Sequence, residues 1–351
     1  MYGGGIWTTQ NKVLAGSYIN FVNVAKTGSA LGSRGIVAIA LALTEAHAGE
    51  VIEVNVSDFI TNPDEILGAS VPTDSMNALK ELFKHATKVY VYNTYVADEG
   101  TAPTVEEICT ALEPYEFNVI AGYTSEAEDI VTYITTVKTW RDEYGKKCQL
   151  VVYDAEQPDS EGVINVVNKT KNEDAPDHAL VAWVAGAEAA CAVNESCTNM
   201  KYDGMYTIEA KDTQAQLEAR IEAGEFAFHM CYGDMRVLED INSLTTFTAD
   251  KGEDFKYNQT MRVCDQSAND FAKMFNTKYL GHIPNDDAGR TSLWADIVKY
   301  YKELETLRAI ENFDSSMVTV AQGETKKSVV VNVAINVVNA MAQLYMTVVV
   351  Q

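Results

Sequence analysis

The sequence predicts a mixed α/β (α+β) protein with a central α/β sheet domain, a helix-rich C-terminal domain and extended β-arms at both ends. Strand-like runs alternate with helical segments from about residue 89 to residue 245, which is typical of an α/β sheet. Helical periodicity dominates after Thr246. The last 24 residues, Ser328 to Gln351, contain no charged side chain and alternate like β-strands.

The composition indicates a globular protein with a large core, because 47% of its residues are hydrophobic and 22% are charged. The 27 basic and 50 acidic side chains give a net charge of −23, which disfavours nucleic acid or an anionic membrane surface as partner. The six cysteines form no CxxC pair, so we expect reduced, buried thiols. The first twelve residues lack the pattern of a signal peptide, which favours folding in a cytoplasm.

Changes of character along the chain suggest five segments. They are an N-terminal arm (1–25), a small β-rich domain (26–92), an α/β domain (93–245), a helical C-terminal domain (246–327) and a C-terminal strand and exchange arm (328–351). If residues 13–24 are extended, they reach about 40 Å at roughly 3.3 Å per residue. Both ends of the chain can therefore act as arms.

Individual elements follow from periodicity and turn residues. Strands are expected at 36–43, 51–56, 89–92, 117–121, 149–153, 163–167, 226–231 and 236–241. Helices are expected at 75–84, 104–113, 125–144, 178–192, 213–223, 265–279 and 290–308. The last two helices place apolar residues on one face, which predicts packing against a core.

The C-terminal stretch contains two segments of period-2 alternation. One face of the first carries Val329, Val331, Val333, Ile335 and Val337, and one face of the second carries Leu344, Met346, Val348 and Val350. An apolar strand at a free terminus needs an edge to pair with, either in its own sheet or on a neighbouring molecule. The stretch is long enough to form a membrane-spanning helix, but its four amide side chains and its strand periodicity are poorly suited to a helix in lipid.

Catalytic motifs are scarce in the sequence. The five histidines are not in HExxH spacing, and residues 32–35 (GSRG) match neither a P-loop nor a dinucleotide fingerprint. Asp174, Asp177 and His178 lie close together in the sequence and could bind a metal. A solvated loop that leads into the start of a helix explains these residues better. Tyr123 to Ser125 follows a strand and precedes a helix, with Ser125 as the expected N-cap, which is where α/β sheets commonly bind ligands. An α/β enzyme with a ligand site there is therefore the alternative hypothesis.

Several segments resemble a known family, the sheath proteins of contractile tails. Those that resemble its C-terminal region are 258–263 (NQTMRV), 281–290 (GHIPNDDAGR) and 341–350 (MAQLYMTVVV). Those that resemble its middle domain and amino terminus are 183–186, 196–199, 202–204 and 4–21. The resemblance covers nearly the whole chain. It is strongest to sheaths of phages of Gram-positive bacteria, of defective-phage particles and of R-type bacteriocins.

The resemblance implies a structural protein that is not an enzyme and has no catalytic, cofactor or metal residues. Its implied partners are copies of itself in a helical array of stacked rings, an inner tail tube protein, and baseplate and tail terminator proteins, with no nucleic acid and no membrane insertion. Such a sheath would assemble in the cytoplasm of a bacterial host and become part of a released virion tail or bacteriocin particle. A metastable extended array of this kind contracts by repacking rigid domains.

The resemblance also implies which residues join neighbouring subunits. Strands near 13–22 and 344–350 would pair close to 329–335 of other subunits by strand addition. The implied arm residues are Val13, Tyr18, Ile19, Phe21, Val329, Val331, Val333, Leu344, Met346, Val348 and Val350. Residues 329–335 would remain in the subunit's own sheet. The predicted helix 290–308 would face the tube with Lys299, Lys302 and Arg308.

Overall fold

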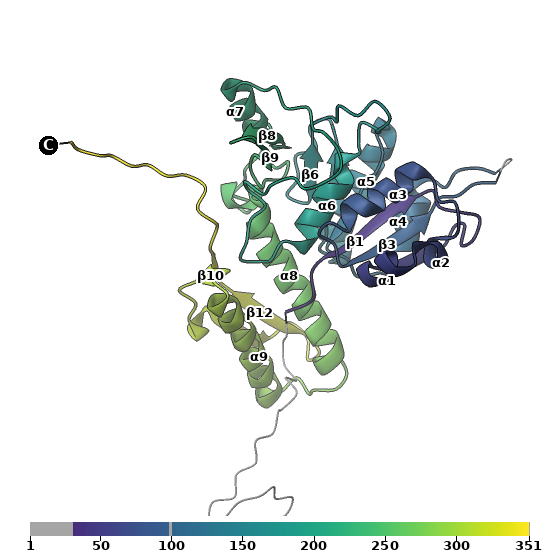
Figure 1. The fold of residues 1–351 in the computed structure, drawn as a ribbon. Helices are drawn as coiled ribbons and strands as arrows, with labels where there is room; N and C mark the ends of the chain where they lie inside the picture. The colour runs from purple at the N-terminus through teal and green to yellow at the C-terminus, as the bar shows by residue number, and fades with distance from the viewer. Residues whose placement is uncertain (1–30, 98–99, 351) are drawn as a thin grey trace, which may run out of the picture.

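A computed structural model of the chain describes residues 31–97 and 100–350. The predicted N-terminal arm, with Val13, Tyr18, Ile19 and Phe21, lies outside these residues. Figure 1 shows a sheet domain above, a smaller helical domain below, and a C-terminal segment that projects away from both. Within the described ranges, no helix combines the length and apolar character needed to cross a membrane.

Seven strands form one sheet in the order β2-β3-β1-β4-β5-β6-β7. The strands are β1 (Ile36–Leu41), β2 (Val51–Asn55), β3 (Lys88–Asn93), β4 (Val119–Ala121), β5 (Gln149–Tyr153), β6 (Val163–Val166) and β7 (Glu225–Phe226). All neighbours are parallel except β2, which runs antiparallel to β3 at the edge. The strands β4, β5 and β6 are buried along their whole length, as expected for a sheet covered on both faces.

The small β-rich domain predicted for residues 26–92 is not a separate unit of this sheet. β1 pairs with β3 on one side and with β4 on the other, so the predicted boundary at residues 92 and 93 falls inside one sheet. β1 and β4 are far apart in the sequence, and the local periodicity of each strand does not predict that the two pair. Two helices of fewer than two turns, α1 (Val56–Thr61) and α2 (Pro63–Leu67), also lie in this segment and are too short to predict from periodicity.

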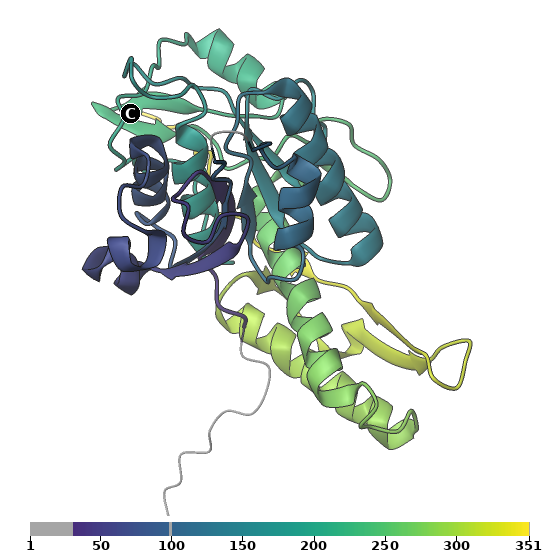
Figure 2. The ribbon, with the colours of Figure 1, turned by 90° about the vertical axis from the view of Figure 1, so that its right-hand side faces the viewer.

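Helices cover both faces of the sheet (Figure 2). α3 (Thr73–Leu82) and α6 (Leu180–Ala190) pack on one face, and α4 (Val105–Leu112) and α5 (Ala127–Thr139) pack on the other. α6 is buried from Leu180 through Ala189 because it lies between the sheet and α3. A Cβ at Gly186 would lie 2.6 Å from the carbonyl oxygen of Leu82, so only glycine allows this close approach of α6 to α3.

Smaller elements complete the sheet domain and lead into the helical domain. They are η1 (Trp140–Tyr144), α7 (Gln214–Glu222), β8 (Phe228–Cys231), β9 (Asp234–Val237) and η2 (Glu253–Lys256). The β8–β9 hairpin turns at Tyr232 and Gly233, whose φ angles of 51° and 87° are typical of a tight hairpin turn.

The helical C-terminal domain consists of two long helices and short strands. Its elements are α8 (Asn258–Met274), the π-helical turn η3 (Phe275–Tyr279), α9 (Asp287–Thr306), β10 (Ile310–Glu311), η4 (Ser315–Met317), β11 (Val318–Gln322), β12 (Val329–Val333) and β13 (Asn336–Val337). α8 begins at Asn258, well before the predicted start at Asp265. Its first half is buried and polar, so it does not show the amphipathic pattern by which a surface helix is recognised.

Ion pairs join the buried half of α8 to the sheet domain. The guanidinium of Arg262 donates to Glu188 on α6 at 2.5 Å and to Asp240 at 2.6 Å, and all three side chains are at most 1% exposed. Asp265, also on α8, accepts two hydrogen bonds from Arg141 at 2.6 and 2.9 Å. The two domains are therefore held together by contacts between buried or nearly buried charged side chains.

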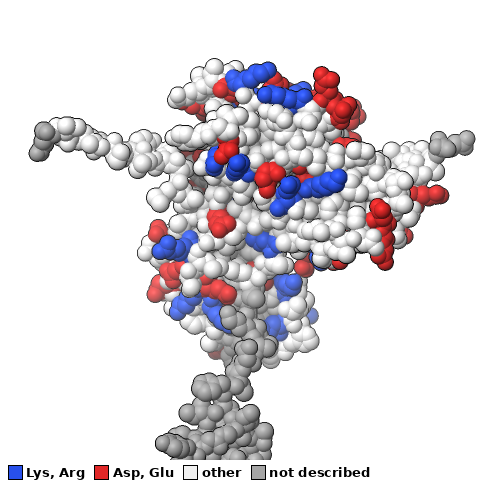
Figure 3. Space-filling model, in the orientation of Figure 1, with Lys and Arg blue, Asp and Glu red and all other residues white. Residues whose placement is uncertain are grey.

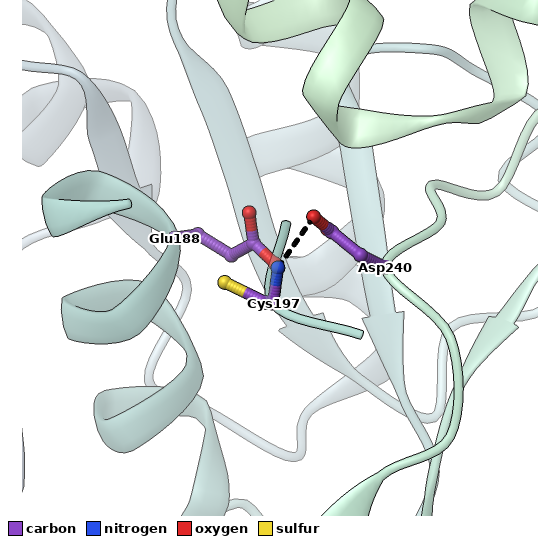
Figure 4. Close-up of side chains that lie close together, drawn as sticks. All are labelled: Glu188, Cys197 and Asp240. Atoms are coloured by element: carbon purple, nitrogen blue, oxygen red, sulfur yellow. Dashed lines mark hydrogen bonds between the residues drawn. The ribbon is translucent and has the colours of Figure 1, made fainter. Parts of the chain in front are cut away.

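The carboxyl groups of Glu188 and Asp240 lie close together in the interior. Figure 4 shows them turned toward one another beside Cys197, whose backbone N–H donates to Asp240 at 2.9 Å. One oxygen of each carboxyl group is buried without any other partner. Burial and the neighbouring Asp240 raise the pKa of Glu188 well above its usual value. Burial opposes ionisation of Asp240, but Arg262 overcomes it and lowers that pKa to about 2. The raised pKa predicts that Glu188 is protonated in the folded chain and can donate to the Asp240 carboxylate.

This assignment predicts opposite results for two isosteric substitutions. Glu188→Gln keeps a donor toward Asp240 and an acceptor for Arg262, so the free energy of unfolding should change by less than about 1 kcal/mol at pH 5. Asp240→Asn leaves the buried Arg262 without its counter-charge and should cost about 3–5 kcal/mol. Urea unfolding of the unassembled chain measures both. Equal losses in the two variants would contradict a protonated Glu188.

The pH dependence of stability provides an independent measurement. Because folding raises the pKa of Glu188 above 4.5, the folded chain retains a proton that the unfolded chain releases. The stabilisation from this group is complete below about pH 4.5 and declines as pH rises. Glu188→Gln removes this decline, so its stability relative to wild type should increase between pH 5 and 8, by up to about 1.4 kcal/mol per pH unit. Parallel pH profiles for the two proteins would refute the raised pKa.

Candidate assembly interface

The C-terminal segment after β13 leaves the molecule as an extended arm (Figure 1). Residues 338–350 form neither helix nor strand, and no backbone hydrogen bond joins 341–350 to the rest of the described chain. Leu344 is 85% exposed, Tyr345 88% and Val350 90%. In the space-filling view the arm carries no charged side chain along its length (Figure 3).

An arm of this composition is unfavourable in water. Each buried side chain of Val, Leu or Met size contributes about 1.5–3 kcal/mol, so covering the apolar residues of the arm is favourable by on the order of 10 kcal/mol before ordering costs. Its unpaired N–H and C=O groups also form a template for a further strand. The predicted arm residues Leu344, Met346, Val348 and Val350 all lie in this segment, are at least 70% exposed and belong to no core cluster of the described chain.

β11 and β12 form a two-stranded antiparallel sheet with open edges. Each of the two strands has one hydrogen-bonded neighbour among the described residues. Val329 and Val333 of β12 pack on the core of the helical domain, whereas Val331 is 39% exposed. β11, which the sequence analysis does not predict, shows the alternation Val318-Thr319-Val320 that is typical of a strand.

α9 carries an exposed basic stripe on the side away from its buried face. Lys299 and Lys302 are exposed, and Arg308 follows the helix as an exposed residue with a φ of 63°. None of the three forms a salt bridge within residues 31–97 and 100–350. Asp296 on the same helix instead pairs with Lys278 and accepts from Tyr279 at 2.5 Å. In Figure 3 basic and acidic side chains both lie over this part of the molecule.

The alternative ligand site at Tyr123 to Ser125 uses its polar groups within the chain. The hydroxyl of Tyr123 donates to Asp74 at 3.0 Å, and its ring packs edge-on against His178 at 4.5 Å between centroids. Ser125 was expected to cap the helix. Instead Glu126 precedes the helix without a side-chain cap, and the hydroxyl of Thr124 accepts from the Glu126 N–H at 3.0 Å. The side-chain oxygens of Tyr123 and Thr124 are therefore engaged within the chain, whereas Ser125 is exposed.

The residues that could bind a metal likewise make other contacts within the chain. Asp177 pairs with Lys169 at 2.9 Å, and His178 faces Tyr123. Among the described residues, one group has ligand atoms within 4.8 Å of one another, namely Glu188, Cys197 and Asp240. Arg262 donates to both of its carboxyl groups and supplies the positive charge that a metal would bring. This group is therefore a buried ion-pair cluster.

Two family models match the chain over most of its length. The phage tail sheath protein central domain matches residues 98–243, and the phage tail sheath C-terminal domain matches residues 250–351. The first match covers the second half of the sheet domain with β8 and β9. The second match covers the helical domain and the C-terminal arm.

Individual relatives agree with these models. The chain is 31% identical to the phage-like element PBSX protein XkdK of Bacillus subtilis over 69% of this chain and 54% of that protein. It is 26% identical to the tail sheath protein of Clostridium phage phiCD119 over 84% of this chain and 81% of that protein. The chain spans about half the length of the two Bacillus relatives that it matches.

Solved structures share the fold. The sheath tail protein of Desulfitobacterium hafniense superposes with a TM-score of 0.73 at 28% identity, over 88% of this chain and 93% of that one. The helical sheath of the anti-feeding prophage in its contracted state superposes with a TM-score of 0.71 at 15% identity, over 96% of this chain and 99% of that one. The two matched family models and the relatives agree with the observed fold. The chain therefore belongs to the phage tail sheath family of structural proteins, which are not enzymes.

Proposed function

We propose that the chain is the subunit of a contractile tail sheath that polymerises by strand exchange around an inner tube. The C-terminal arm of one subunit adds to the open β11–β12 sheet of its neighbour, and the N-terminal arm predicted for residues 1–25 takes part in the same mesh. Contraction from a metastable extended array then drives the tube through a cell envelope. The finished sheath belongs to a released phage tail or a related bacteriocin-like particle, after assembly in the host cytoplasm with baseplate and terminator proteins.

One observation carries this proposal. The same chain contains an unpaired apolar arm and a small sheet with open edges to which such an arm can add. Among the residues that the structure describes, the arm has exposed apolar side chains and unpaired backbone, and the β11–β12 sheet has free edges. The arm and the sheet edge lie on different surfaces of the subunit, so the contact between neighbours is head-to-tail. When such contacts repeat without closing into a ring, they produce a helical array. Strand addition supplies backbone hydrogen bonds for affinity and alternate side chains for register.

Contraction is supported by the division of the molecule into a rigid body and an arm. The sheet and helical domains are joined by buried ion pairs, so the body can rotate as a unit. The arm leaves this body without backbone contacts after Ala340 and can act as the hinge between neighbours. The contracted helical sheath of the anti-feeding prophage has the same fold.

Removal of the arm tests strand exchange directly. Deletion of Gln343–Gln351 should leave a folded chain with the thermal stability of wild type, because residues 343–350 are exposed and belong to no core cluster. The truncated chain should form no tubes in negative-stain electron microscopy at concentrations at which the full chain does. Normal tubes from the truncated chain would exclude the arm as the joining element.

Neighbouring positions in the arm provide the matched control. Val348 lies on the predicted inward face and Val349 on the opposite face, although both are at least 70% exposed in the free subunit. Val348→Asp should lower the yield of sedimentable polymer at least about tenfold, since it buries an unpaired charge in the shared sheet. Val349→Asp should have a much smaller effect. Equal effects would mean that the arm does not bind as a strand.

Contact with the tube is proposed for the exposed face of α9. The double substitution Lys299→Glu/Lys302→Glu removes two free positive charges without disturbing a salt bridge of the described chain. We expect the sheath polymer to form as before and its co-sedimentation with preassembled tubes to decrease at least about fivefold at low salt. The control Lys80→Glu/Lys84→Glu changes the same charge on exposed residues near α3. Unchanged tube binding would place the contact elsewhere.

A further inference from the structure

The root of the C-terminal arm is held by one buried side chain of α8. Gln259 is 3% exposed, and both ends of its amide bind the main chain of the arm. Its Nε2 donates to the carbonyl of Val338 at 3.0 Å, and its Oε1 accepts from the N–H of Ala340 at 2.9 Å. This pair of bonds imitates a neighbouring strand. The hydroxyl of Thr260 adds a hydrogen bond to the Asn339 side chain at 3.2 Å.

Beyond Ala340 the backbone of the described chain makes no further hydrogen bond to the body of the subunit. The last backbone hydrogen bond of the segment runs from the Val338 N–H to the carbonyl of Ala309 at 3.0 Å. A cavity of about 320 Å³ lies beside the root, between Tyr257, Gln259 and the arm residues Asn339 and Gln343. The arm therefore changes from fixed to free within a few residues after Ala340, with open space beside it.

The first described residues are held by the same helix. The N–H of Gly32 donates to both oxygens of Asp270, at 3.1 and 3.2 Å, and Asp270 is fixed in turn by Gln266 at 3.0 Å and by the hydroxyl of Tyr300 at 2.9 Å. A Cβ on Gly32 would lie 2.6 Å from the Asp270 oxygen and 2.7 Å from the Gln266 nitrogen. A larger residue at this position would therefore displace the Asp270 carboxylate or the Gln266 amide.

The two anchors share one face of α8. Asp270 follows Gln259 by eleven positions, which is about 20° from three full turns and about 16 Å along the axis. Figure 1 shows the start of the described chain and the root of the C-terminal arm both beside this helix. The helix cannot stretch or turn within the subunit, because Arg262 and Asp265 between the anchors are fixed in buried ion pairs.

We propose that α8 is the spacer that sets the distance and relative orientation of the two exchange arms, with Gln259 holding the C-terminal root and Asp270 the N-terminal root. The inference rests on the proposed strand exchange. It adds a reason for a constant lattice repeat, because each subunit would present its two arms from fixed points on one helix. Residues 341–343, next to the cavity, are the hinge over which the arm bends.

Hydrogen exchange of the full-length, unassembled chain tests the anchors. Gln259→Met removes both bonds to the arm at similar volume and should speed exchange of the Ala340 amide at least about tenfold, with the Gly32 amide unchanged. Gly32→Ala displaces the Asp270 carboxylate and should change only the amides at the N-terminal root. The control Gln214→Met, on the exposed face of α7, should change neither. Unchanged exchange at Ala340, or loss of protection at both roots in one variant, would overturn the assignment.

Assembly tests the spacer itself. Both anchor variants should keep the thermal stability of wild type to within a few degrees and should give fewer tubes with a wider spread of axial repeat in electron microscopy. Tubes with the yield and repeat of wild type would overturn the spacer. If the wild-type chain itself forms no tubes, the strand-exchange proposal fails, whereas the exchange rates at Ala340 and Gly32 still decide whether the side chains hold the arm roots.

Discussion

The buried charge of Arg262 is the constraint on which the arrangement of the subunit depends. A guanidinium that is 1% exposed is tolerable only with a counter-charge and hydrogen bonds at fixed positions. Asp240 supplies the charge, and Glu188 supplies an acceptor while it remains protonated. These partners come from the helical layer and the loops of the sheet domain, whereas Arg262 belongs to the first helix of the next domain. Satisfying one charge therefore fixes the two domains against each other.

Rigidity of this kind matters because the rest of the assembly is proposed to depend on mobile connections. A body joined through apolar packing alone tolerates small sliding, since such contacts have no direction. Ion pairs and amide hydrogen bonds are directional, and α8 carries both kinds on its buried surface. The same helix thus joins the domains and holds the roots of the chain at both ends. Its unusually polar interior face is explained by these contacts.

The arm has the opposite physical character. It contributes nothing to the core of its own subunit, and its apolar surface is uncovered. Under the proposed strand exchange, the stability of the body and the affinity between subunits are therefore separable, and substitutions in the arm are expected to change assembly with little effect on folding. Free edges at β11 and β12 would be a hazard in an isolated protein. In the proposed strand exchange they are the edges to which the arm of a neighbouring subunit adds.

Local patterns in the sequence determined most of the elements and the character of the C-terminal stretch. The alternation of strands and helices after residue 88, the helices of the C-terminal domain and the uncharged apolar end can all be recognised from neighbouring residues, because periodicity of 2 or 3.6 is a local property. The similarity of short segments to tail sheath proteins likewise needs no structure. The family models agree with it.

Only the tertiary structure decided which distant residues meet. The pairing of β1 with β4, the early start of α8 at Asn258 and the meeting of Glu188 and Asp240 at Arg262 depend on contacts between remote segments. A buried glutamine such as Gln259 has no sequence signature, since its partners are backbone groups 79 and 81 positions away. Polar residues in a helix are ordinarily taken to face water. Here they face the interior, because the chain ends and the sheet domain supply their partners.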